Sequence, residues 1–207
     1  MTPARTSRRR LLLAAPLLLA GCQSLLPTQT YHPRTDWVLA PPPPPPPPAR
    51  APHGPVLMLR ALNAGPDVDQ RGIARITPEG TITYGYYNRW AADPAAAATA
   101  ALDQWLRASG QFSAVISPAS RLAPDLIVEG TLTRLAADPQ RKQANAALTL
   151  TLMRSSADGT TSLRGQTVLS ATAPIAGPGI ADDVSAVRAA LADVLGQAVA
   201  FASQTSR

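Results

Sequence analysis

The pattern of hydrophobic and polar positions predicts strands over much of the chain beyond residue 55. Residues 56–59 are all apolar, as expected of a strand that is buried on both faces. Apolar and polar residues alternate over 126–135 and 146–154, and more weakly over 163–172. Because successive side chains of a strand point to opposite faces, this period of two predicts three strands, each with one better-buried face.

A hairpin and a helix are predicted before these three strands. Thr77-Pro78-Glu79-Gly80 joins two extended segments, 71–76 and 81–86, with proline and glycine where a type I turn favours them. Asp93-Pro94 then provides a cap and a first-turn proline for an alanine-rich helix that stops at Gly110. The residues expected to face inward from this helix are Ala98, Leu102, Trp105 and Leu106.

A second, amphipathic helix is predicted near the C-terminus. Asp182-Asp183 provides its cap, and the apolar residues that follow recur at intervals of three and four. These residues are Val184, Val187, Leu191, Val194, Leu195, Ala198 and Ala202. The order of strand, hairpin, helix, strands and helix favours an α/β fold over residues 55–207, in which a mixed β-sheet is packed by two main helices.

Residues 1–21 have the pattern of an export signal peptide. A basic segment precedes an apolar stretch, 11–20, which is shorter than the roughly 20 residues needed to span a bilayer. The stretch ends in Leu19-Ala20-Gly21-Cys22, which resembles the lipobox of bacterial lipoproteins. That resemblance implies attachment of a diacylglycerol to the Cys22 thiol. The alternative is that Cys22 is a small buried residue that happens to follow a leucine run.

Lipidation of Cys22 would anchor the mature chain, since each buried methylene contributes about 0.8 kcal/mol. Among lipoproteins, an aspartate after the lipidated cysteine favours the inner membrane, whereas residue 23 here is Gln. The resemblance therefore implies the periplasmic face of the outer membrane of a Gram-negative bacterium. Residues 7–12 also resemble a twin-arginine export signal, although ordinary charged leader segments often contain such runs.

Residues 22–54 are predicted to be a proline-rich tether between the membrane and the domain. Pro41–Pro48 is an unbroken proline run, which as a polyproline II helix would extend about 25 Å and act as a semi-rigid spacer. The alternative is that the run is a ligand for the aromatic groove of another protein. Trp37 lies in the same segment, either at the membrane interface or docked on the domain.

Composition narrows the chemistry that the domain can offer. The 207 residues carry a formal charge of +6, but four arginines lie in the first ten residues, so little positive charge is left to suggest nucleic-acid binding. The two histidines, His32 and His53, flank the proline run, and Cys22 is the one cysteine. The usual zinc sites and Ser-His-Asp triads therefore lack their residues, and we expect no metal or other cofactor.

Carboxylates are the remaining candidates for catalysis. Asp125 and Glu129 lie four residues apart in a predicted strand, which separates them by about 13 Å, farther than the two carboxylates of a glycosidase. Asp182-Asp183 is interpreted as a helix cap. We therefore expect a protein that is not an enzyme, and a carboxylate-dependent hydrolase is the weakest alternative.

Several segments together resemble the ABC-type transport auxiliary lipoproteins. They are Tyr86 to Pro94, residues 106–115, residues 125–130 and the C-terminal amphipathic helix, and the lipobox agrees with them. The resemblance implies a small lipoprotein that accompanies mammalian-cell-entry (MCE) domain proteins and ABC permeases. That family is linked to the movement of phospholipids or other apolar molecules between two membranes, by binding partner proteins.

Aromatic and basic residues just before the first helix are the candidates for a partner interface. Tyr87 and Arg89 are of the types that anchor interfaces, whereas Trp90 and Trp105 are expected in the core. Self-association into a homo-oligomeric ring would match the symmetry of an oligomeric partner. The alternative function is a lipoprotein cofactor of a cell-wall synthase or a secretion channel, for which a long tether would be useful.

Replacing Cys22 with alanine removes the predicted acceptor of the lipid. We expect the Cys22→Ala protein to leave the membrane fraction and to lose most of its function, because the acyl chains supply the anchor. Cell fractionation measures the first effect, with Ser24→Ala as the control. A Cys22→Ala protein that stays with the membranes at full function would contradict the lipid anchor.

Overall fold

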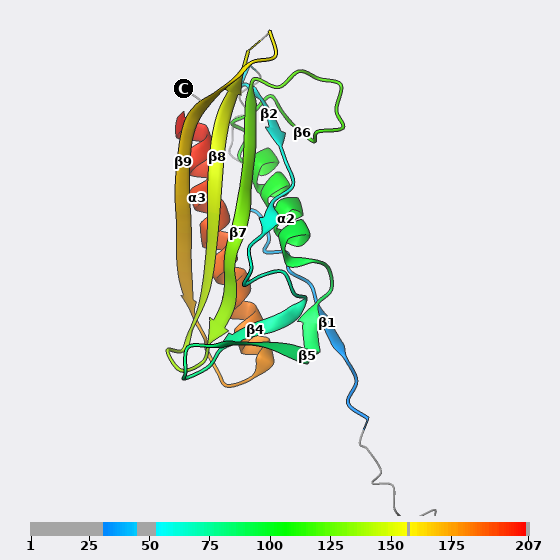
Figure 1. Cartoon of the computed structure of the whole chain (residues 1–207), viewed down its shortest axis with the longest axis vertical. Coiled ribbons are helices and arrows are strands. Elements are labelled where there is room, and N and C mark those ends of the chain that lie inside the picture. The colour runs from blue at the N-terminus through cyan, green and yellow to red at the C-terminus, as the bar shows by residue number, and fades with distance from the viewer. Residues whose placement is uncertain (1–30, 45–52, 157, 206–207) are drawn as a thin grey trace, which may run out of the picture. The chain divides into compact units, whose positions relative to one another are not determined.

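One mixed β-sheet carries two helices on one of its faces (Figure 1). The computed structural model describes residues 31–44, 53–156 and 158–205. The predicted signal peptide, Cys22 and the second half of the proline run, Pro45–Pro48, lie outside the described residues. The fold class expected from the sequence is confirmed.

The elements follow one another in an order close to the predicted one. The strands are β1 (Thr35–Trp37), β2 (Val56–Leu59), β3 (Asn63–Ala64), β4 (Gly72–Ile76), β5 (Ile82–Trp90), β6 (Ala114–Ile116), β7 (Leu126–Asp138), β8 (Gln143–Ser155) and β9 (Thr161–Pro174). The helices are α2 (Pro94–Ala108) and α3 (Ile180–Thr205). The strands β1 and β3 were not expected from the sequence pattern.

Strand β7 organises the whole sheet. Along one edge it pairs with β8 in antiparallel fashion over its full length, and β9 pairs with β8 in the same way. The other edge of β7 is shared by three short parallel strands, β2, β3 and β4 in succession. The sheet therefore continues as two arms, one from β2 to β6 and one from β4 through β5 to β1.

The core lies between the helices and one face of the sheet. Leu148, Leu150 and Leu152 of β8 are buried against this side, whereas Thr149 and Thr151 between them are only half-buried. Helix α3 packs on β8 and β9 and contacts α2. Strand β2 follows the same alternation, so the prediction that it is buried on both faces is wrong. The reason is that both helices lie on one side of the sheet.

Helix α2 confirms the local predictions made for it. The Asp93 carboxylate accepts a hydrogen bond from the backbone N–H of Ala96 at 2.9 Å, and Pro94 is the first helical residue. This is the N-cap arrangement that satisfies a backbone donor which the helix itself leaves unpaired. The four residues expected inside, Ala98, Leu102, Trp105 and Leu106, are all buried, as is Trp90.

The N-terminal boundary of the domain differs from the predicted one at residue 55. Residues Thr35–Trp37 form β1 and pair in parallel with Asn88–Trp90 of β5. Leu39 is 3% exposed, and the carbonyl oxygen of Pro41 accepts a hydrogen bond from the Trp105 indole at 3.4 Å. The unit defined by internal contacts accordingly begins at Arg34.

This boundary changes the role of the proline run. Because β1 precedes Pro41 and β2 follows Pro48, the run connects two strands of the same sheet. It therefore does not separate Cys22 from the domain, as the tether prediction supposed. The sequence pattern missed this arrangement because a three-residue strand and a single buried leucine carry no periodicity of their own.

Two neighbouring substitutions test whether residues 34–41 belong to the domain. We expect Leu39→Ala to lower the free energy of unfolding by about 2–4 kcal/mol, because it removes a buried side chain from the core. Val38→Ala is the matched control, since that side chain is 59% exposed and its loss should cost less than about 0.5 kcal/mol. Denaturant unfolding measures both, and equal small effects would show that this segment is not part of the folded domain.

Candidate functional site

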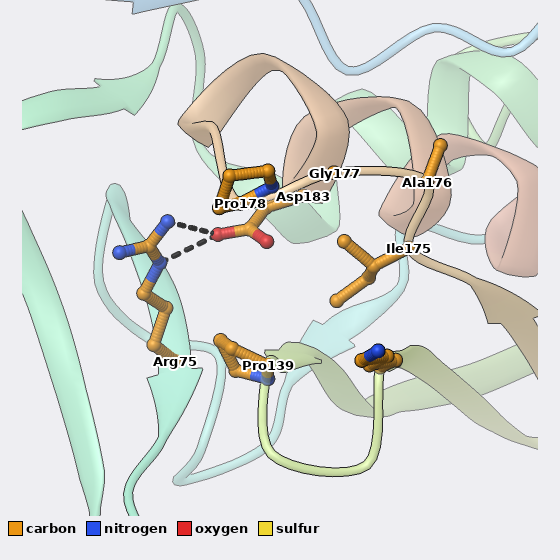
Figure 2. A pocket seen from close by; sticks show the side chains of 8 residues that line it. Arg75, Pro139, Ile175, Ala176, Gly177, Pro178 and Asp183 are labelled. Atoms are coloured by element: carbon orange, nitrogen blue, oxygen red, sulfur yellow. Dashed lines mark hydrogen bonds and ion pairs between the residues drawn. The ribbon is translucent and has the colours of Figure 1, made fainter.

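A cleft of about 400 Å³ opens at one end of the sheet, where β4, the turn between β7 and β8, and the loop before α3 meet (Figure 2). The topology brings these parts together. Since β8 is antiparallel to both β7 and β9, the end of β7, the start of β8, the end of β9 and the start of α3 lie at one end. The lining residues are Arg75, Pro139, Lys142, Ile175, Ala176, Gly177, Pro178 and Asp183.

The β7–β8 turn forms one wall of the cleft. The Asp138 carboxylate accepts a hydrogen bond from the Arg141 N–H at 3.0 Å, which holds the turn closed. Lys142 has a left-handed backbone conformation, with φ of 51°, and its carbonyl oxygen accepts a hydrogen bond from the Ile175 N–H at 2.9 Å. This bond joins the turn to the loop that precedes α3. The cleft therefore has two walls fixed to each other by backbone hydrogen bonding.

The start of α3 provides the acidic residue of the cleft. Asp182 accepts a hydrogen bond from the Gly179 N–H at 3.1 Å. Because α3 begins at Ile180, Asp182 lies inside the first turn and stabilises the helix start in the manner of a capping box, so the prediction that it precedes the helix as an N-cap is wrong. Asp183 does not share this role. Its side chain is 2% exposed and pairs with Arg75 of β4, whose Nε lies 2.5 Å from Oδ2. Sequence reasoning missed this pair because its members lie 108 residues apart.

The two oxygens of Asp183 have different surroundings. Arg75 directs both Nε and a terminal nitrogen at Oδ2. No described residue donates a hydrogen bond to Oδ1, which faces the cavity on the side of Ile175 in Figure 2. The wall of the cleft thus presents an acceptor oxygen that is accessible from the cleft, on a carboxylate that is otherwise nearly buried. The cleft can offer hydrogen bonding and charge pairing, with apolar contacts from Pro139, Ile175 and Pro178.

The predicted interface residues lie on β5, beside β1. Tyr87 is 44% exposed, and its ring meets that of Tyr86 edge-on with centroids 5.0 Å apart. Tyr86 is 67% exposed and has the Arg34 guanidinium carbon 4.3 Å from its ring centroid. These three residues, Arg34, Tyr86 and Tyr87, form what we call the aromatic patch. Arg34 was not anticipated because the sequence placed it in the tether.

Arg89 has a partner within the domain. Its Nε donates a hydrogen bond to Oδ1 of Asp36 at 2.6 Å, which fastens β1 to β5. This hydrogen bond holds the pKa of the Asp36 carboxyl below its usual value and raises the pKa of the Arg89 guanidinium. Arg71 lies 3.8 Å from the same Asp36 oxygen. The structure therefore gives Arg89 a role in holding β1, beside its predicted place in an interface.

The carboxylates that were considered for catalysis have separate partners. Asp125 accepts a hydrogen bond from the Val56 N–H at 2.7 Å, and Glu129 forms an ion pair with Arg60 at 2.8 Å. Both contacts join β7 or its approach to the β2 arm. Within residues 31–44, 53–156 and 158–205, no group of three or more His, Cys, Asp or Glu side chains could hold a metal ion.

Comparison with known proteins gives a family match and a shared fold. The family model described as "ABC-type transport auxiliary lipoprotein component" matches residues 37–199. A crystal structure from Xanthomonas campestris, assigned to the family model DUF330, is 18% identical with a TM-score of 0.69, over 82% of this chain and 95% of that one. An uncharacterized protein of solved structure is 12% identical with a TM-score of 0.61, over 84% and 98%. No curated protein matches this chain.

The pH dependence of stability tests the ion pair between Asp36 and Arg89. Because the folded-state pKa of Asp36 is lowered, the pair stabilises fully above the usual pKa of 3.8 and loses its effect as pH falls through the lower folded value. We expect Asp36→Asn to unfold at lower denaturant concentration than the native chain at pH 7, and at the same concentration near about pH 2. A difference that persists unchanged in acid would contradict this assignment.

Proposed function

Since this chain belongs to the family of ABC-type transport auxiliary lipoproteins, we propose that it is a membrane-anchored periplasmic subunit of an MCE-type lipid transport system. In this proposal it binds an MCE-domain protein and the associated ABC permease, and it catalyses no reaction. The single observation that carries the proposal is the family match, which covers the domain from β1 to within α3.

The proposed anchor is a lipid on Cys22, in the periplasmic face of the outer membrane. Arg34, where the domain begins, lies 12 residues beyond Cys22. An extended chain covers at most about 3.6 Å per residue, so this connection spans at most about 43 Å. The end of the domain that carries β1 would then stay near the bilayer that holds the lipid.

A short connection also bears on the alternative function. A cofactor of a cell-wall synthase or a secretion channel was attractive because a long tether could reach distant partners. Because β1 precedes the proline run, the segment between Cys22 and the domain is shorter than the predicted tether, which supports a partner close to the membrane. The proposed partner must therefore reach the bilayer that holds the lipid of Cys22, as the MCE-domain protein of a transport system would.

The aromatic patch is the proposed surface for this partner. Exposed tyrosines and arginines dominate the energetics of many interfaces, because they combine large contact area with hydrogen bonding. The patch lies on an arm of the sheet, away from the core, so a partner can cover it without disturbing the packing. A ring of several copies of this chain would increase the avidity for an oligomeric partner.

Copurification tests the proposed partner. We expect the membrane-extracted native protein to retain an MCE-domain protein, identified by mass spectrometry, and Tyr87→Ala to reduce the recovered amount at least about fivefold. Leu163→Ala is the control, because Leu163 is 65% exposed on β9, outside the patch. Recovery of a cell-wall synthase or a secretion channel instead would favour the alternative function.

A further inference from the structure

We propose that the cleft beside Asp183 binds the polar headgroup of a glycerophospholipid that contains a hydrogen-bond donor. In this arrangement Oδ1 of Asp183 accepts from the donor, an ammonium or a hydroxyl, and Lys142 binds the phosphate. The inference rests on the proposed function, since it assigns the lipid a site on this subunit.

The oxygen Oδ1 of Asp183 is the first reason. A carboxylate accepts hydrogen bonds at both oxygens. Arg75 engages only Oδ2, and Oδ1 faces the cavity (Figure 2). Among the described residues no buried side-chain oxygen lacks a hydrogen-bond partner, so Oδ1 is accessible from the cleft, where the donor of a ligand can take the place of water. The site therefore favours a ligand that brings a donor with it.

The balance of charge is the second reason. The cleft contains two cations, Arg75 and Lys142, and one carboxylate, which Arg75 already neutralises. Among the described residues, no acidic side chain forms an ion pair with Lys142. Its ammonium is thus available for a phosphate, to which lysine binds as a point charge. A ligand with one anionic group and one hydrogen-bond donor can therefore bind Lys142 through the anion and Oδ1 of Asp183 through the donor.

The apolar surface and the position of the cleft complete the argument. Pro139, Ile175 and Pro178 line the space between the polar groups, where they can contact the glycerol backbone and the first methylenes. The cleft has the volume of a small-molecule site. The β7–β8 turn and the start of α3, which line it, lie at the same end of the domain as β1 (Figure 1), and β1 is the first described element after Cys22 in the sequence. Headgroups of the anchoring bilayer would therefore be within reach.

Headgroup chemistry supplies a sharp comparison. Ethanolamine and glycerol headgroups carry N–H or O–H donors, whereas the trimethylammonium of choline has none. The phosphate is common to all three. The proposal therefore predicts that Asp183 distinguishes phosphatidylethanolamine and phosphatidylglycerol from phosphatidylcholine, and that Lys142 does not.

The experiment measures binding of short-chain lipids to the full chain carrying Cys22→Ala, a substitution outside the described residues. Dihexanoyl phosphatidylethanolamine, phosphatidylglycerol and phosphatidylcholine are titrated below their micellar concentrations and followed by calorimetry. We expect saturable binding of at least one donor-containing lipid, at least about tenfold tighter than that of phosphatidylcholine. Equal affinity for all three, or no saturable binding, would overturn the proposal.

Free headgroups and phosphate identify the source of the ligand. Glycerophosphoethanolamine, glycerophosphoglycerol and inorganic phosphate are titrated in the same way. We expect the two glycerophospho compounds to bind more weakly than the lipids with the same headgroup, because the acyl stems add apolar contacts. We expect inorganic phosphate to bind more weakly than either lipid. These results support a phospholipid ligand. Binding of any of them as tight as that of the lipids would overturn it in favour of a soluble phosphate compound.

Two variants test the site itself. Lys142→Ala should weaken all phosphate-containing lipids at least about fivefold, while Arg164→Ala, which removes an exposed cation from β9, should leave affinity unchanged. Asp183→Asn should remove the preference over choline. Because that change could unfold the domain, Ala176→Trp is the second variant: this exposed lining residue can be enlarged to obstruct the cleft. Unchanged binding in both Lys142→Ala and Ala176→Trp would overturn the site.

Copurification of the same two variants separates this inference from the proposed function. Loss of headgroup binding with the MCE-domain protein retained supports a lipid site that is independent of the partner surface. If the native chain binds no lipid but still retains its partner, the headgroup site is wrong and the proposed function stands. If the native chain retains no MCE-domain protein, the proposed function fails whatever the calorimetry shows.

Discussion

The docking of residues 34–41 on the domain is the contact on which the rest of this structure depends. It combines three interactions of different kinds. The strand β1 pairs with β5, the side chain of Leu39 is buried in the core, and Arg188 of α3 donates to the carbonyl oxygen of Val38 at 2.8 Å. Burial of the leucine supplies most of the stabilisation, because the ion pairs at this edge are exposed.

This contact determines which end of the domain is tied to the chain that precedes it. The β4–β5–β1 arm lies toward the end that carries the β7–β8 turn and the start of α3, and the β2–β6 arm lies toward the other (Figure 1). The aromatic patch belongs to the first arm, and the β7–β8 turn and the start of α3 line the Asp183 cleft. The split follows from the unequal lengths of the strands. A 13-residue β7 is fully paired on the β8 side, but on its other side three short strands divide its edge. Each arm can therefore carry a separate surface.

Local features of the sequence predicted local structure well. The alternation in β8 and most of β9, the Asp93 cap and the inward residues of α2 follow from backbone geometry and burial within a few residues. In β7 the predicted alternation is wrong, because Leu126, Ile127 and Val128 are all buried. The strand β1 and the pair of Arg75 with Asp183 could not be found in this way, because each depends on contacts between segments far apart in the chain. Asp182 and Asp183 show why local sequence is not sufficient, because adjacent aspartates at a helix start look alike. The structure gives them different partners: Asp182 accepts from the Gly179 N–H, and Asp183 pairs with Arg75 of β4.

Hydrogen exchange in the full-length protein tests most directly whether residues 34–41 are docked. We expect the β1 amides that pair with β5, together with the Ala91 N–H that donates to the Trp37 carbonyl at 2.7 Å, to exchange slowly. Exchange of these amides at the rate of an unstructured peptide, with the rest of β5 still protected, would contradict the docking of this segment. In that case the proline run would again separate the anchor from the domain.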